Sequence, residues 1–411
     1  MPVFSKYIFS TPPLVRSVCI SYPIYDRTTG KQLQWQDCVQ SRRPVIMVPI
    51  NRDRGVFRLK FALRLIAVLA AITVVILFTT QNTKENDPLI SPVPNTALPG
   101  EGAPPAGQET VSRPETGLSV LVGETTEKLT ADFGRPDRIE PSMYGYEWWV
   151  YSSPAETYMM AGVQNGTVNQ VYAAGADLDV SPFSIGGAME EIYRSTIIEP
   201  EVSVEIGTNR YLFSMNGDDL EERLLVAYEG VYAQVYADRE EGEVMAVRFL
   251  SPRVLVLHQP YEMTYEGHLI ATEPLSSAVQ IAADRAAEQQ VMELTNVFRR
   301  RHELQPLQAD GSAAVIARER AADAARGSRS EESAGPLSEP LKLAGIDYSE
   351  AGENIAADYV DAAATVHGWV NSAEHRELIF NRKYNRQAAG VSNKVYSHLF
   401  LNRKEPAGSS D

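Results

Sequence analysis

The side chains best suited to acid–base, nucleophilic or metal chemistry are six histidines and the hydroxyl and carboxyl groups near them. His367 precedes His375 by eight residues, so on one helix the two rings would lie roughly 80° apart. Ser372 is close to His375, but the Gly-x-Ser-x-Gly turn of a nucleophilic serine is absent, and we expect Ser372 to cap or orient a turn. His398 falls on a candidate strand as a sheet-facing residue, whereas His302 follows three arginines, which indicates a solvated ring. Without the Gly-x-Ser-x-Gly turn, a serine hydrolase is not indicated. No phosphate-binding glycine loop is present either, so a nucleotide-dependent enzyme is not indicated.

Four aromatic residues, Trp148, Trp149, Tyr151 and Tyr158, could instead form a surface that stacks on a sugar or a peptide. Alternate residues of a strand face opposite sides of its sheet, and aromatic side chains are common on the buried side. We therefore favour a structural interpretation, in which these rings fill the buried face.

The elements that carry the histidines are mostly helical. From about residue 277, Val291, Leu294 and Phe298 recur at helical spacing. Two further helices and two closing strands are predicted at 312–325, 362–380, 387–393 and 395–403.

The preceding part of the chain, 117–258, predicts a duplicated α+β domain. A helix and a Gly-Arg-Pro turn at 123–139 lead into a three-stranded meander with an Asn165–Gly166 hairpin turn. The strands of that meander are predicted at 146–152, 157–166 and 167–175. The same order returns about 63 residues later, with a helix at 186–195 and strands at 210–215, 223–230 and 231–249.

Residues 81–116 contain seven prolines among Gly, Thr and Glu. Such a stretch cannot bury enough apolar surface to order itself, and we expect an extended spacer.

An apolar run at 65–78 contains Thr73 as its only polar side chain. Extended to 61–80, it reaches about 20 residues, the length of a membrane-spanning helix, with Arg64 snorkelling at its edge. Basic residues crowd the upstream side, so the positive-inside rule places residues 1–60 in the cytoplasm and everything after 80 outside. These basic residues are Arg42, Arg43, Arg52, Arg54, Arg58 and Lys60.

Two alternatives remain open at this end of the chain. The apolar run could be a cleaved signal peptide, although the sequence after Phe78 is poorly shaped for cleavage. Met47 begins a short basic lead into the run, so residues 1–46 either belong to the protein or extend the gene model beyond a natural start at Met47.

Composition narrows the class of protein. The net charge of −15 and the lack of a sustained basic stripe in the C-terminal part argue against a nucleic-acid partner. Both cysteines, Cys19 and Cys38, precede the apolar run, so the later domains must be stable without disulfides. This pattern suits a bacterial surface protein.

Four phrases in the C-terminal part occur in a characteristic order: 295–310, 342–356, 369–380 and 384–392. With its Gly-Glu-Asn and Trp-x-x-Ser-x-x-His-Arg motifs, the region 287–404 resembles the bacterial branch of the CAP superfamily (cysteine-rich secretory proteins, antigen 5 and pathogenesis-related proteins). The region before it resembles the CAP-associated domain of certain Gram-positive surface proteins. For the CAP part, the resemblance implies an α-β-α sandwich. Together with the patterns above, this predicts an α+β protein in which one N-terminal transmembrane helix and the duplicated CAP-associated domain precede the sandwich.

Members of this family often hold a divalent ion between two histidines and two glutamates. By resemblance, Glu353 and His375 match one acid and one histidine, and Glu339 lies about where the other acid belongs. Arg329 stands where the other histidine is expected, and a guanidinium cannot coordinate a cation. We therefore expect a ligand-gripping or structural polar cleft of Glu339, Glu353, His375 and Arg329, with a degenerate metal site as the less favoured alternative.

Two functions follow from this resemblance. The favoured hypothesis is a non-enzymatic module that is tethered to the cell membrane, lacks a cofactor and binds a cell-wall or extracellular ligand or protein. The alternative is a metal-assisted hydrolase or protease that uses Glu353 as base with His375 and Glu339 as ligands.

Overall fold

The computed structural model describes residues 64–66, 68–70, 83–93, 97–99, 111–327 and 335–403. The chain divides into two units, residues 1–71 and 72–411, and each is described by itself.

Residues 64–66 and 68–70 of the first unit are helical, and Ile66 and Val68 are exposed. Within the described part of the chain, no helix is long and apolar enough to cross a membrane. The remainder of the predicted span 61–80, both cysteines and Met47 lie outside the described residues.

The second unit contains a middle domain built on a seven-stranded antiparallel sheet with the order β10-β11-β12-β7-β6-β5-β4. Two three-stranded meanders, β5–β6–β7 and β10–β11–β12, meet where β7 pairs with β12. The strands are β4 Arg138–Pro141, β5 Glu147–Tyr151, β6 Met159–Gln164, β7 Thr167–Ala173, β10 Arg223–Tyr228, β11 Val231–Asp238 and β12 Glu243–Leu250. The helices of this domain are α2 Thr126–Phe133, α3 Met189–Ser195, α4 Gly217–Glu222 and α5 Pro252–His258.

The meander predicted after residue 146 is confirmed, and its Asn165–Gly166 turn has the positive φ values of 53° and 75° that such a hairpin requires. The prediction that 210–215 opens the second meander is wrong. This segment is β9 (Asn209–Ser214), which pairs with β8 (Glu201–Ile206) and β13 (Glu262–Glu266) in a four-stranded sheet. An alternating pattern identifies a strand but does not name its neighbour.

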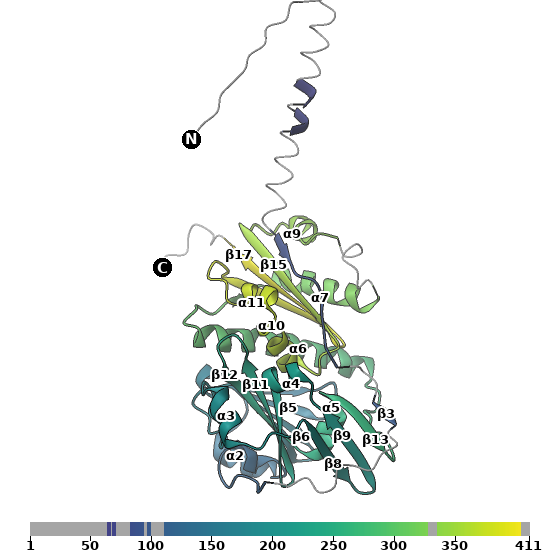
Figure 1. Cartoon of the computed structure of the whole chain (residues 1–411). Coiled ribbons are helices and arrows are strands. Elements are labelled where there is room, and N and C mark those ends of the chain that lie inside the picture. The colour runs from purple at the N-terminus through teal and green to yellow at the C-terminus, as the bar shows by residue number, and fades with distance from the viewer. Residues whose placement is uncertain are drawn as a thin grey trace, which may run out of the picture. The chain divides into compact units, whose positions relative to one another are not determined.

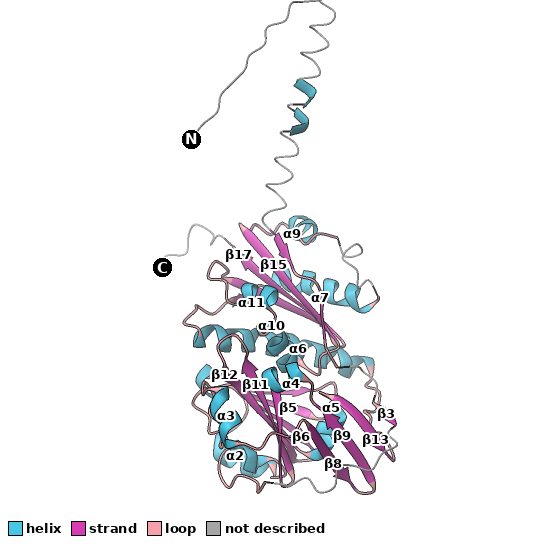
Figure 2. Ribbon diagram, viewed as in Figure 1, coloured by secondary structure: helices cyan, strands magenta, loops and turns pink. Residues whose placement is uncertain are grey.

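The C-terminal domain is a sandwich with helices on both faces of its sheet (Figures 1 and 2). The sheet order is β1-β15-β17-β16-β14, with β2 also on β15. One face packs on α7 and α9, and the other on α6, α10 and α11. The strands are β1 Thr83–Glu85, β2 Leu89–Ile90, β14 Gln308–Ala309, β15 Glu350–Ala357, β16 Arg386–Ser392 and β17 Val395–Asn402. The helices are α6 Ser277–Arg301, α7 Gly311–Ala325, α9 Ser338–Leu343, α10 Ala362–Val370 and α11 Ala373–Ile379.

Helices α6 and α10 lie between the C-terminal sheet and the seven-stranded sheet (Figure 1). One continuous apolar core joins the two domains, because Trp148 and Tyr158 of the middle domain pack in the same cluster as Phe298 and Trp369 of the C-terminal domain. This burial confirms the structural interpretation of the aromatic residues. Trp148 and Val150 face this core, while Tyr151 belongs to the core on the other side of the sheet.

Two expectations about the C-terminal part need correction. The single helix predicted over 362–380 is two helices, α10 and α11, which are separated at Asn371 and Ser372. His367 and His375 therefore lie on different helices, and the angle expected for one helix does not apply.

The spacer predicted over 81–116 is docked at several points. β1 and β2 pair in parallel with β15, β3 (Leu98–Pro99) pairs with β13, and Val111 forms a bridge with Tyr228. A stretch of this composition does not order itself, but the edge of a distant sheet supplies order to it here. We call residues 83–91 the strap.

Candidate functional site

The strap lies along the edge of β15 that β17 leaves free. The register pairs Glu85 with Glu353 and, after a break, Leu89 with Ala356. The break falls at Pro88, which has no backbone N–H to donate to a ladder. The strap thus runs along the sheet edge beside the Gly-Glu-Asn motif.

Glu353 of that motif is 1% exposed. Its Oε2 atom accepts from Arg320 Nε at 2.5 Å, and its Oε1 atom accepts from the Ser397 hydroxyl at 2.7 Å. Burial raises the pKa of the Glu353 carboxyl, and both Arg320 and Ser397 oppose that shift. The carboxylate is therefore held by a matched pair of donors inside the domain.

Arg320 projects from α7 and joins the strap to the sheet. Its Nη2 atom lies 2.9 Å from Glu85 Oε2, and its Nη1 atom donates to the Gly335 carbonyl at 3.1 Å. The other oxygen of Glu85 accepts from the Leu337 amide at 2.8 Å. One guanidinium thus bridges a carboxylate of the sheet and a carboxylate of the strap.

Asn354, the last residue of the motif, is fully buried and faces Asn86. Asn86 Nδ2 donates to Asn354 Oδ1 and to the Glu374 carbonyl, both at 2.9 Å. Asn354 Nδ2 in turn donates to the His375 carbonyl at 3.0 Å. The two amides link the strap, β15 and α11.

His375 has both ring nitrogens engaged. Nε2 donates to the Asp87 carbonyl at 3.0 Å, because a carbonyl only accepts. Nδ1 must then accept from the Ser372 hydroxyl at 2.8 Å, so Ser372 orients the ring, in line with its predicted role at a turn. Burial lowers the pKa of His375, which favours the neutral ring that these two contacts require.

The other two predicted site residues are Glu339 and Arg329. Glu339 is exposed on α9, and Arg329 falls among the residues that are not described. Among the described residues, the ligand atoms of Glu339, Glu353 and His375 are not all within 4.8 Å of one another. A cation would compete with Arg320 for Glu353 and with Ser372 for His375, so these donors do not fit a metal as they are arranged.

Sequence reasoning missed Arg320, Ser397 and the strap. The arginine that the resemblance placed in the cleft was Arg329, whereas the guanidinium that contacts Glu353 in the structure belongs to Arg320. Arg320 lies within an alanine-rich helical phrase, and its place on the buried face of α7 was the one available signal.

A second polar cluster joins the two domains. Arg376, from the His-Arg pair of the motif, lies 2.7 Å from the buried Asp238 and 3.0 Å from Glu240 at the turn between β11 and β12. His302 Nδ1 lies 3.2 Å from Glu241 at the same turn, so the prediction that His302 is solvated is wrong. The side chain is 21% exposed, because Glu241 of the middle domain and Phe380 of the CAP domain both contact it. No local pattern records these long-range contacts.

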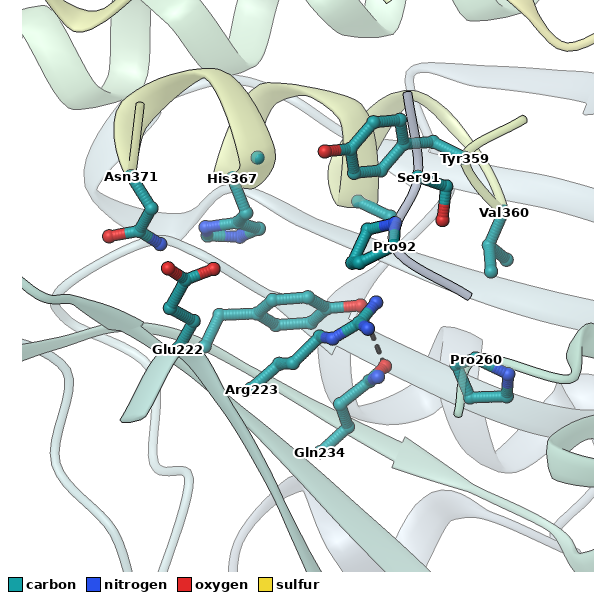
Figure 3. A pocket seen from close by; sticks show the side chains of 13 residues that line it. Ser91, Pro92, Glu222, Arg223, Gln234, Pro260, Tyr359, Val360, His367 and Asn371 are labelled. Atoms are coloured by element: carbon teal, nitrogen blue, oxygen red, sulfur yellow. Dashed lines mark hydrogen bonds between the residues drawn. The ribbon is translucent and has the colours of Figure 1, made fainter. Parts of the chain in front are cut away.

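A small cavity of about 40 Å³ also lies between the domains and the end of the strap (Figure 3). Gln234 and Tyr236 border it from β11, and His367 from α10. His367 donates to or accepts from the Tyr172 hydroxyl at 2.8 Å and stacks on Tyr236. The cavity has room for only a few water molecules, which makes it part of a tight polar interface.

His398 confirms its predicted place on a sheet. It is fully buried and contacts Gln387 Oε1 at 3.0 Å from Nε2.

Comparison with known proteins agrees with this architecture. The model of the CAP-associated N-terminal domain matches residues 122–261, and the model of the cysteine-rich secretory protein (CAP) family matches residues 292–396. The uncharacterized membrane protein YlbC of Bacillus subtilis is 34% identical over 296 residues, which are 71% of this chain and 86% of that protein.

Two solved structures share the fold. An extracellular protein of Bacillus anthracis that contains an SCP domain is 32% identical, with a TM-score of 0.67 over 74% of this chain and 100% of that chain. A cysteine-rich secretory protein of Staphylococcus aureus is 27% identical, with a TM-score of 0.66 over 77% of this chain and 98% of that chain. The chain belongs to the cysteine-rich secretory protein (CAP) family and carries a CAP-associated N-terminal domain.

Proposed function

We propose that this protein is a non-enzymatic binding module that the segment 61–80 tethers to the cell membrane, with its CAP domain acting outside the cell at the envelope. The observation that carries the proposal is the state of Glu353 and His375. Glu353 is buried between Arg320 and Ser397, and His375 uses both nitrogens, so neither side chain is poised as a general base or a metal ligand.

The location rests on different support. The apolar run and its upstream basic residues predict an anchor, and related proteins are named a membrane protein and an extracellular protein. No cysteine follows residue 38, so one cysteine introduced after the apolar run can report the topology of that part. In intact cells, an impermeant maleimide should label a Thr208→Cys variant, in which position 208 is an exposed turn, and should leave Cys19 and Cys38 unlabelled until the cells are lysed. Labelling of position 208 only after lysis would contradict the proposed topology.

Zinc calorimetry on the purified full-length protein tests the absence of metal chemistry. We expect no stoichiometric zinc binding and no hydrolysis of casein or cell-wall fragments. Stoichiometric binding that Glu353→Gln and His375→Ala both abolish, together with hydrolysis, would overturn the proposal in favour of a metal-assisted hydrolase. Binding activity itself is tested by passing labelled cell-wall fragments and surface-protein peptides over the immobilised protein.

A further inference from the structure

Four buried polar residues of the CAP domain line the edge of β15 that the strap occupies, and the side chains of three of them have a hydrogen-bond partner in the strap. These residues are between 0% and 6% exposed: Arg320, Glu353, Asn354 and His375. Three of these four side chains contact the strap directly. Arg320 donates to the carboxylate of Glu85, and Asn354 accepts from the carboxamide of Asn86. His375 donates to the carbonyl of Asp87. Each contact matches a group of a different chemical kind.

The strap itself is held weakly by everything except these contacts. Its ladder consists of three residues and then two, interrupted at Pro88, and only Asn86 of the strap is buried. Ile90 is 45% exposed, and the Lys84–Glu377 pair lies at the surface, where an ion pair contributes little. Little apolar burial therefore holds the strap in place.

Buried charged and amide groups cost free energy unless they are paired, and an edge strand with a merely structural role does not require a row of them. Recognition by strand addition does require it, because backbone hydrogen bonds supply affinity and side-chain contacts supply specificity. The edge of β15 offers both kinds of contact to the strap: Asn86 N donates to the Glu353 carbonyl at 3.1 Å, and Ser91 N donates to the Ala357 carbonyl at 3.0 Å.

We propose that the strap occupies the binding site of the ligand and that this ligand is an extended polypeptide. The polypeptide displaces the strap and adds to β15 as a parallel strand. The peptide carries a Glu-Asn pair. Its carboxylate accepts from Arg320 and from the Leu337 amide, and its carboxamide donates to Asn354. The carbonyl of its next residue accepts from His375. The strap keeps this edge closed until such a segment competes for it. This inference rests on the proposed binding function and names its ligand class.

The test uses the full-length protein and a fluorescent peptide with the sequence of residues 83–91, Thr-Lys-Glu-Asn-Asp-Pro-Leu-Ile-Ser. A second peptide, in which Glu and Asn are exchanged, has the same composition and charge. Asn86→Ala removes both hydrogen bonds of the Asn86 amide and should open the edge, and Lys84→Ala is the matched control within the strap.

We expect Asn86→Ala to bind the first peptide about tenfold or more tightly than the wild type, because the competing closed state is depopulated. Lys84→Ala should bind like the wild type, and the exchanged peptide should not bind measurably to any variant. Circular dichroism confirms that the variants are folded, and Glu85→Gln provides a second way to loosen the strap.

Equal binding of both peptides, or no binding to either loosened variant, would overturn the inference. If cell-wall fragments bound the loosened variants while the peptide did not, the binding function would stand and the peptide ligand would be wrong. Stoichiometric zinc binding with hydrolysis would instead remove the proposed function itself.

Discussion

Arg320 Nη2 lies 2.5 Å from Glu353 Oε2, and both side chains are almost fully excluded from solvent. The pair connects α7 to β15 at the point where Glu85 of the strap pairs with β15. Because a buried charge without its partner is costly, the consequences of breaking this pair are large and measurable.

Replacing Arg320 by Met should lower the free energy of unfolding by about 3–5 kcal/mol, because Glu353 remains buried without its guanidinium. Chemical denaturation measures the effect. Arg326→Met is the control on the same segment, since Arg326 and its partner Asp323 are exposed, and it should change stability by less than about 1 kcal/mol. The double variant Arg320→Met/Glu353→Gln should be less destabilised than the sum of the two single variants, and strict additivity would contradict the pairing.

Gly390→Ala should destabilise the CAP domain by about 3 kcal/mol or more. A Cβ at residue 390 of β16 would lie 2.2 Å from the backbone of Ala317 and Arg318 on α7, and a backbone contact cannot yield as a flexible side chain would. Gly311→Ala on the same helix meets nothing within 4 Å and should stay within about 0.5 kcal/mol of the wild type. Equal melting temperatures for the two variants would show that α7 does not pack on β16 in this way.

Arg376→Ala should weaken the contact between the domains, with a loss of about 3 kcal/mol in the free energy of unfolding, since Asp238 would be left buried and unpaired. The control is Arg239→Ala on the same turn, whose exposed ion pairs with Asp218, Glu221 and Glu222 should be dispensable. If Arg239→Ala proved as damaging as Arg376→Ala, the turn would be held by exposed charges and not by the motif arginine.

Acid should destabilise the protein through its buried histidines. Burial lowers the pKa of His258 and His398 to about 3, while an unfolded histidine titrates near 6.5. Between these values the unfolded chain binds more protons than the folded one, so stability falls as the pH is lowered, by about 1.4 kcal/mol per pH unit for each histidine. Unfolding free energies measured between pH 6.5 and pH 4 should show a shallower slope for His398→Gln and an unchanged slope for the exposed His268→Gln. Identical slopes for the wild type and His398→Gln would refute the buried neutral state of His398.

Local patterns predicted several helices and strands correctly. The spacing of Val291, Leu294 and Phe298 indicated α6, and the hairpin residues Asn165 and Gly166 indicated the first meander. Each signal depends on a few neighbouring residues, and short-range physics is sufficient to produce it.

Long-range relations were missed for a physical reason. The strap reads as a polar, proline-rich spacer, and its order comes from the edge of β15, which is encoded some 270 residues later. Likewise, the sequence singled out Glu353 and His375, but their partners Arg320 and Asp87 come from segments whose distance in sequence hides the contact. Sequence patterns identify elements, whereas the partner of an edge strand or a buried charge depends on the whole fold.

Hydrogen–deuterium exchange of the strap in the full-length protein tests the closed edge of β15 most directly. Asn86 and Ser91 donate their amides to β15, so both should exchange slowly in the wild type and in Lys84→Ala, and much faster in Asn86→Ala, where the amide at residue 86 is still present. The amides of β17, on the other side of β15, should be unaffected. If the strap of the wild type exchanged as fast as that of Asn86→Ala, the polar cluster would be open in solution, and the strap could not be the occupant of the site.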